Sequence, residues 1–203
     1  MILEAISVGA MGANCYILAS GKGLRGIIID PGDEGEKILQ VLKTHHLTPG
    51  IVINTHGHYD HIAANDKFGL TVYVHSLDAP MLIEPMLNLS GLFSVAYKVK
   101  SKIKPVEDGE IISLDKVELK VLHTPGHTPG GISLLMLKPE NDIVFTGDTL
   151  FCRGIGRCDL PGGNEDALFN SIRQKLFTLP DETRIFPGHG PSSTIKEEKK
   201  NLL

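Results

Sequence analysis

The sequence predicts an α/β fold, in which short buried strands alternate with helices. Short apolar runs of the length typical of buried strands recur along the chain. Stretches with apolar residues at helical spacing lie between these runs, and Gly, Pro, Asn or Asp separates the two kinds of segment. The chain has 203 residues, of which 41% are apolar and 22% charged. That length can bury one sizeable core, so we expect a single domain over residues 1–203.

The first part of the chain is expected to begin with two strands and then to alternate between helices and strands. A Gly-rich segment, 8–14, precedes the first strand, and the second strand ends sharply at Asp30-Pro31-Gly32. A helix follows, because apolar residues recur there at helical spacing. Strands are predicted at 15–18, 26–29, 51–53 and 70–74, and helices at 33–46, 62–68 and 76–82.

The second part begins with the segment least typical of regular structure, 83–105, whose weak periodicity indicates an irregular or mobile region. Beyond it the apolar runs return. A Gly-rich loop is expected at 153–163 and a helix at 165–177, where apolar residues again have helical spacing. Strands are predicted at 117–122, 132–137, 143–145 and 184–186.

Charge and cysteine usage narrow the class of protein. The formal net charge of −4 argues against a general nucleic-acid-binding surface. The one dense basic run, 196–200, is interleaved with Glu197 and Glu198 and is typical of a solvated terminal helix. Three cysteines form no recognisable disulfide framework, which favours a reducing compartment. An acidic residue near the start, Glu4, and the lack of a bilayer-length apolar run favour a cytoplasmic protein without membrane contact.

The densest cluster of metal-ligating side chains is the segment Thr55-His56-Gly57-His58-Tyr59-Asp60-His61. Imidazole and carboxylate are natural ligands for zinc and similar divalent ions. His56 and His58 are two residues apart on an extended segment, so both side chains can leave one face and share one metal. Asp60 and His61 follow where the chain turns, so we expect them to address a second ion. A wet loop or a helix cap is the alternative for a lone histidine, and this density argues against it.

Three further candidate ligands lie in loops beside apolar strands. They are His127 in Thr124-Pro125-Gly126-His127-Thr128, Asp148 in Thr146-Gly147-Asp148-Thr149, and His189 in Pro187-Gly188-His189-Gly190. A rigid sheet positions such side chains, and the glycines let the backbone approach closely. His75 and His123 also close apolar strands, and we expect them to be structural.

The H-x-H-x-D-H motif followed in order by a histidine, an aspartate and a histidine resembles the metallo-β-lactamase superfamily over nearly the whole chain. The resemblance implies an α/β fold with four layers, an αβ/βα sandwich of two mixed β-sheets with helices on the outer faces. It also implies two divalent ions at one edge of the sandwich, most readily Zn, with Fe or Mn accepted by the same ligands. By this resemblance His56, His58 and His127 bind the first metal, Asp60, His61 and His189 bind the second, and Asp148 bridges both.

Within the superfamily, three segments look like glyoxalase II-type thioesterases: 147–151, 154–157 and 187–190. Only fourteen residues follow His189, so the chain resembles a short form that lacks the C-terminal helical domain. The implied reaction is hydrolysis of a thioester, hydroxyacyl-glutathione, by a metal-bridging hydroxide that Asp60 helps to orient. Thiolate leaves readily because the pKa of a thiol is about 8.5, so no general acid is required.

The implied partner is a small anionic thioester, because two divalent ions with two carboxylates and one hydroxide leave a positive centre. Arg153 and Arg157 are the candidates for binding a substrate carboxylate, since guanidinium offers forked donors. Arg157 could instead form an internal salt bridge with Asp159 that shapes the loop. Tyr59, beside the ligands, is a third candidate for substrate contact.

Several other functions use related chemistry. The main rival is an iron oxygenase of the persulfide dioxygenase type, which would use His56, His127 and Asp148 and shares the pattern Arg157-Cys158-Asp159. Esters, lactones and phosphodiesters are further possible substrates. The bridging aspartate argues against a β-lactamase, and the net charge and short chain argue against a nuclease. A non-catalytic binding module is disfavoured, because degenerate members usually lose ligands.

Overall fold

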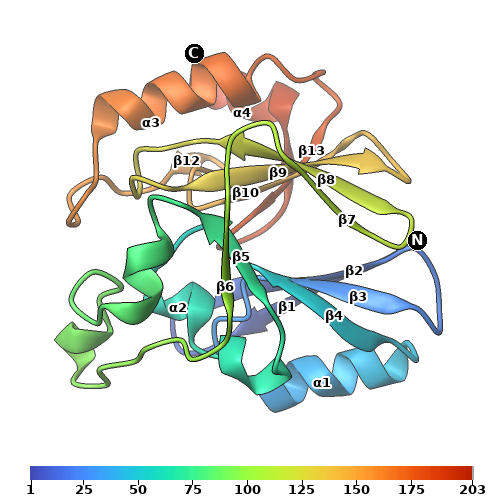
Figure 1. Cartoon of the computed structure of the whole chain (residues 1–203). Coiled ribbons are helices and arrows are strands. Elements are labelled where there is room, and N and C mark those ends of the chain that lie inside the picture. Colours follow the sequence, from blue (N-terminus) through green and yellow to red (C-terminus); the bar gives the residue numbers. More distant parts are fainter. Residues whose placement is uncertain (203) are drawn as a thin grey trace.

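A computed structural model describes residues 1–202 as two six-stranded sheets that pack face to face, each covered on its outer side by helices (Figure 1). Helix α1 (Gly35–Thr44) covers one sheet, and helices α3 (Glu165–Ser171) and α4 (Ile195–Leu202) cover the other. This confirms the predicted four-layered αβ/βα sandwich. Within residues 1–202, no helix is long and apolar enough to cross a membrane.

The first sheet takes its strands in chain order, β1-β2-β3-β4-β5-β6. The first three strands are antiparallel neighbours, and β3 to β6 are parallel. Parallel neighbours need a crossover, which α1 supplies between β3 and β4. The bounds are β1 Ile2–Val8, β2 Ala13–Ala19, β3 Arg25–Ile29, β4 Thr48–Ile53, β5 Val72–His75 and β6 Ile103–Val106.

The second sheet has the order β14-β13-β10-β9-β8-β7. Strands β7 to β10 form antiparallel pairs, and β10 pairs with β13 in parallel. A small hairpin of β11 (Leu150–Phe151) and β12 (Gly154–Ile155) stands beside it. The bounds are β7 Ile111–Leu114, β8 Val117–His123, β9 Ile132–Lys138, β10 Ile143–Gly147, β13 Arg184–Pro187 and β14 Ser193–Thr194.

Three apolar layers hold the sandwich together, and strand alternation distributes residues between them. In β3, Ile28 packs toward α1, whereas Ile27 and Ile29 pack into the layer between the sheets. Phe145 of β10 lies in that middle layer, and its neighbour Val144 packs toward α3 and α4. Both sheets are therefore buried on both faces, as the apolar strand runs predicted.

The structure corrects several element boundaries. Segment 62–68 is not one helix: a helical turn, α2 (Tyr59–Ile62), begins among the candidate ligands, and a 3₁₀ turn covers Asn65–Phe68. The helix predicted at 76–82 is a 3₁₀ turn over Ala79–Ile83, with Pro80 near its start. The irregular segment 83–105 contains the 3₁₀ turn η3 (Ser90–Phe93), and its end forms the edge strand β6.

Edge position explains why β6 escapes prediction. Pro105 cannot donate a ladder hydrogen bond, and an edge strand tolerates this because one side has no partner strand. Strands β1 and β7 were also not predicted, and each is the outermost strand of its sheet. Their side chains are only partly buried, so their apolar pattern is weak. The predicted helix at 165–177 is confirmed as α3 continued by the π-helical turn Ile172–Leu176.

Candidate metal centre

The seven candidate ligands are brought together at one edge of the sandwich, where strands from both sheets end. Segment 55–61 follows β4 of the first sheet. In the second sheet, His127 follows β8, Asp148 follows β10 and His189 follows β13. A hydrogen bond across the two sheets fixes the last of these loops: the Tyr16 hydroxyl on β2 donates to the Pro187 carbonyl at 2.6 Å.

One group of nitrogens comes from His56, His58 and His127, which can place one ligand atom each within 4.8 Å of the others. Nδ1 of His58 lies 2.9 Å from Nε2 of His127. All three side chains are buried. As predicted from their spacing, His56 and His58 leave the extended segment toward the same point.

A second group comes from Asp60, His61 and His189. Nε2 of His61 lies 3.3 Å from Nε2 of His189, and the latter lies 3.3 Å from Oδ2 of Asp60. Asp148 stands between the groups: its Oδ1 is 3.5 Å from Nε2 of His61, and its Oδ2 is 3.6 Å from Nε2 of His127. Its position is therefore suited to a ligand shared by the two groups.

The hydrogen bonding of this cluster fits metal binding. Nε2 of His56, Nε2 of His58 and Oδ1 of Asp148 are buried and have no hydrogen-bond partner. Leaving a buried polar atom unpaired costs about 1–3 kcal/mol, and a bound cation would remove that cost. Imidazole and carboxylate donors favour zinc, iron or manganese. The residues present thus fit divalent metal ions.

The ionisable side chains of the cluster shift one another's pKa values. Burial, followed by the charges of neighbouring histidines, lowers the pKa of His56, and the same causes lower the pKa of His58 to about 3. Burial would also lower the pKa of His61, but Asp148, Asp60 and Asp30 raise it to about 10. Two neighbouring histidines are thus kept neutral, which is the form that binds metal.

Asp30 orients His61 and connects it to the chain that carries His56. Its Oδ2 lies 3.1 Å from Nδ1 of His61. The same carboxylate accepts hydrogen bonds from the backbone N–H of Thr55 at 2.7 Å and from the Thr55 hydroxyl at 2.6 Å. A carboxylate behind a ligating histidine fixes its tautomer and ring orientation.

Asp78 performs a similar role for the first group. Its side chain is fully buried and accepts hydrogen bonds from Gly57 N at 3.0 Å, Thr128 Oγ1 at 2.7 Å and Gly130 N at 2.6 Å. Gly57 lies between His56 and His58, and Thr128 follows His127. One carboxylate therefore joins the two loops that supply the first group of ligands.

Two glycines are required by the close packing around Asp148. A side chain at Gly188 would overlap Oδ1 of Asp148 and crowd the ring of His61. A side chain at Gly156 would overlap the Asp148 carbonyl. The Gly-rich segments predicted from the sequence thus serve close approach of the backbone to the ligands.

A cavity of about 520 Å³ opens above the ligands, and its floor contains His58, Asp60, His127, Asp148 and His189. This volume lies in the range of small-molecule sites. Of the predicted substrate contacts, Tyr59 and Arg157 line the cavity. Tyr59 also packs edge-on against Tyr97, with ring centroids 5.7 Å apart.

The two predicted arginines differ in position. Arg157 forms the anticipated salt bridge, with two hydrogen bonds of 2.7 Å to Asp159. Its backbone carbonyl accepts a hydrogen bond from Nδ1 of His127 at 2.8 Å. Arg153 instead lines a separate depression, where its backbone N–H donates to Glu198. Arg153 lies in the turn between β11 and β12 and does not line the cavity above the ligands. Its position therefore gives no support to a contact with substrate.

Sequence reasoning missed Asp30 and Asp78 as supports of the ligands. Asp30 had one available signal, since it ends a buried strand as the ligand loops do. Asp78 had none, because its partners Gly57 and Gly130 lie far from it in the sequence.

Comparison with known families places the chain in context. The model of the metallo-beta-lactamase superfamily matches residues 8–189. A probable metallo-hydrolase, YqgX of Bacillus subtilis, is 40% identical, with 95% of this chain and 92% of the relative covered. The hydroxyacylglutathione hydrolase GloC of Haemophilus influenzae is 35% identical, with 99% and 96% covered.

Solved structures show the same fold. The BLEG-1 B3 metallo-beta-lactamase has a TM-score of 0.89 at 34% identity, covering 98% of this chain and 97% of that one. TTHA1623 in a di-iron-bound form has a TM-score of 0.82 at 37% identity and covers 98% of both chains. ETHE1 from Myxococcus xanthus has a TM-score of 0.79 at 31% identity, covering 100% and 84%.

Proposed function

The chain belongs to the metallo-beta-lactamase superfamily, and we propose that it is a binuclear metal-dependent thioesterase that acts on hydroxyacyl-glutathione. The observation that carries this proposal is the position of Asp148 between two groups of metal-ligating side chains on the floor of the cavity. The similarity to hydroxyacylglutathione hydrolase GloC supports the choice of substrate.

The ligand set defines where the reaction takes place. The first ion is assigned to His56, His58 and His127, and the second to Asp60, His61 and His189, with Asp148 shared. Bound divalent ions, zinc in this proposal, would lower the pKa of a water molecule toward about 7 and polarise the substrate carbonyl.

Asp60 is the residue we assign to orienting the attacking water. Its Oδ2 faces both histidines of the second group, at 3.3 Å from Nε2 of His189 and 3.7 Å from Nε2 of His61. Its Oδ1 then remains to accept a hydrogen bond from water. Burial alone would raise the pKa of Asp60, but the charge of His61 and the contact with His189 lower it below its usual range. The carboxylate is therefore ionised and acts as an acceptor at neutral pH.

The leaving group needs little help from the protein. A thiolate is a stable product because the pKa of a thiol is about 8.5, so no general acid is required beside the scissile bond. Arg157 lies on the cavity wall and can bind a substrate carboxylate, in exchange for part of its bond to Asp159. Tyr59 also lines the cavity and is the second candidate for substrate contact.

A second candidate function is oxidation of a persulfide by a single iron ion held by His56, His127 and Asp148. The similarity to ETHE1 from Myxococcus xanthus favours it, together with the Arg157–Asp159 pair that the sequence pattern anticipated. Four ligands, His58, Asp60, His61 and His189, would then have no role in metal binding. The full complement of ligands is the reason that hydrolysis is preferred.

Parallel assays separate these functions. Protein stripped of metal and reloaded with zinc, iron or manganese is assayed on S-lactoylglutathione, on glutathione persulfide with oxygen uptake, and on a β-lactam. We expect thioester hydrolysis that is lost on chelation and restored by metal. Oxygen uptake with persulfide and no thioester turnover would replace the proposal by the second candidate, and turnover of the β-lactam alone would replace both.

A further inference from the structure

Four apolar side chains from two loops line part of the cavity, beside the polar Asn88. They are Met11, from the turn between β1 and β2, and Leu89, Leu92 and Phe93, in and beside η3. We call these four residues the apolar wall. Leu92 is 64% exposed and Phe93 is 57% exposed, although both are large and hydrophobic. Large exposed apolar side chains that gather at a cavity are typical of a ligand-binding groove.

Hydrogen bonds fix the segment that carries Leu89, Leu92 and Phe93 of the apolar wall. The Asn88 side chain donates to the Met81 carbonyl at 2.9 Å and to the Tyr97 carbonyl at 3.1 Å. The Ser90 hydroxyl accepts from Tyr97 N at 2.9 Å. These bonds tie both ends of the turn to the body of the protein, so Leu92 and Phe93 are displayed without being buried by it.

The backbone of the turn also carries strain. Leu89 has φ 71° and Ser94 has φ 58°, which lie in the left-handed region that side chains other than glycine rarely adopt. Such residues persist where the surrounding structure fixes them, and they cluster at binding sites. The strain brackets the exposed Leu92 and Phe93.

The rest of the apolar lining consists of Phe151, Ile155 and Leu160. Arg157, in the same segment of the chain, is the one lysine or arginine among the residues that line the cavity. Glutathione carries two carboxylates, and the single guanidinium of Arg157, which is already paired with Asp159, can bind at most one of them. The thiol portion of the substrate is therefore matched to the Arg157 side, and the apolar wall is left for the other portion.

We propose that the apolar wall binds an apolar acyl chain, so that the thioesterase also hydrolyses glutathione thioesters of medium-chain acids and prefers them to those of short-chain acids. This inference rests on the proposed thioesterase function and specifies its substrate class. The carbonyl lies over the ligands, the acyl chain contacts Leu92 and Phe93, and the thiol portion extends past Arg157 toward solvent.

The test is a series of S-acyl glutathiones that share one thiol, from acetyl through butanoyl to octanoyl, assayed with metal-loaded protein beside S-lactoylglutathione. A fully buried methylene raises kcat/KM about fourfold. Because the wall is open to solvent, we expect about twofold per methylene, and hence an octanoyl-to-acetyl ratio on the order of fiftyfold. A second series with a constant acetyl group and apolar thiols tests the assigned direction.

Substitutions in the apolar wall test whether the preference for longer acyl chains arises there. In the double variant Leu92→Ser and Phe93→Ser, we expect the octanoyl-to-acetyl ratio to fall to within about fivefold of unity. Ile111→Ser is the matched control, since Ile111 is 54% exposed on the edge strand β7 and does not line the cavity. Its ratio is expected to equal that of the wild type.

Calorimetric binding of octanoate and acetate to the metal-loaded protein gives a readout that does not require turnover. Tighter binding of octanoate, weakened in the double variant and not in Ile111→Ser, supports the proposal. Equal kcat/KM for acetyl and octanoyl thioesters overturns it while leaving the thioesterase function intact, and so does a preference that follows the thiol instead of the acyl chain. If no thioester is hydrolysed, the proposed function fails, and the octanoate measurement alone decides whether the apolar wall binds an alkyl chain.

Discussion

Asp78 is the residue whose replacement most sharply tests how the ligand loops are positioned. Asp78→Asn keeps the size of the side chain and replaces one acceptor oxygen by a donor. The three partners, Gly57 N, Thr128 Oγ1 and Gly130 N, all donate to the carboxylate. At least one of the two backbone N–H groups must therefore lose its acceptor, and the remaining bonds lose the charge that strengthens them.

The magnitude follows from these contacts. An unpaired buried donor costs about 1–3 kcal/mol, and weakening the other two bonds brings the total to roughly 2–4 kcal/mol. For a chain of this size the corresponding fall in Tm is roughly 4–16 °C. Because the loops carrying His58 and His127 are released, metal affinity is expected to fall about 10–100-fold.

Circular dichroism melting and titration against a chromophoric chelator measure the two effects. Asp115→Asn is the matched control: Asp115 also accepts a backbone hydrogen bond, from Arg25 N, but at the end of β3 that lies away from the ligands. It should lose some stability and no metal affinity. Wild-type metal affinity in Asp78→Asn would refute the positioning role, even if Tm fell.

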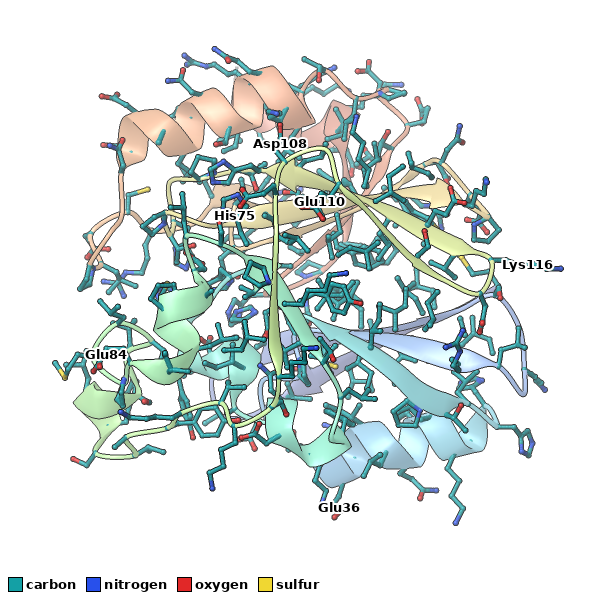
Figure 2. The ribbon with its side chains drawn as sticks, viewed as in Figure 1. Glu36, His75, Glu84, Asp108, Glu110 and Lys116 are labelled. Carbon is teal, nitrogen blue, oxygen red and sulfur yellow. The ribbon has the colours of Figure 1, made fainter. Side chains whose placement is uncertain are left out.

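Two further perturbations test the packing around the site and the junction of the sheets. Gly188→Ala is expected to abolish metal binding, because its methyl group overlaps the Asp148 carboxylate. Gly21→Ala is the control, since Gly21 lies in an open surface turn and its replacement should leave the metal content unchanged. Equal metal content in both variants would contradict the steric argument. His75 stacks on His123 with ring centroids 4.0 Å apart, near the loop that carries Asp108 and Glu110 (Figure 2). Burial, and then the charge of His123, lower the pKa of His75, so the unfolded chain binds more protons and the free energy of unfolding should fall as the pH drops from about 8 through the unfolded pKa of about 6.5. Urea titrations at several pH values in this range give the free energy of unfolding, which should depend less steeply on pH in His75→Gln than in the wild type. An identical dependence on pH in both proteins would contradict the assignment.

The ligands of the candidate site could be predicted because metal chemistry restricts the residue types and their spacing. His56 and His58 share a face at i and i+2, and each remaining ligand follows an apolar strand. Long-range partners leave no such local trace. Asp30 and Asp78 could not be assigned to His61 and Gly57 before the sheets were paired, since nothing in their own segments names those partners.

The fold was predictable where strands are buried on both faces, as in β3 and β10, because such strands are continuous apolar runs. Edge strands are partly exposed, and β1 and β6 were missed for that reason. The 3₁₀ turn Ala79–Ile83 was predicted as a longer helix, because over so few residues the spacing of apolar side chains does not distinguish the two kinds of helix. Arg153 also could not be placed from its sequence neighbours, because a single turn decides whether it faces the cavity.

Elemental analysis of purified protein, wild type and His189→Ala, tests the proposed binuclear centre most directly. His189 belongs to the second ligand group and not to the first, so its loss should remove one ion and retain the other. We expect about two divalent ions per wild-type chain and about one in the variant, with thioesterase activity lost on chelation. At most one ion in the wild type, or full activity in metal-free protein, would contradict the account.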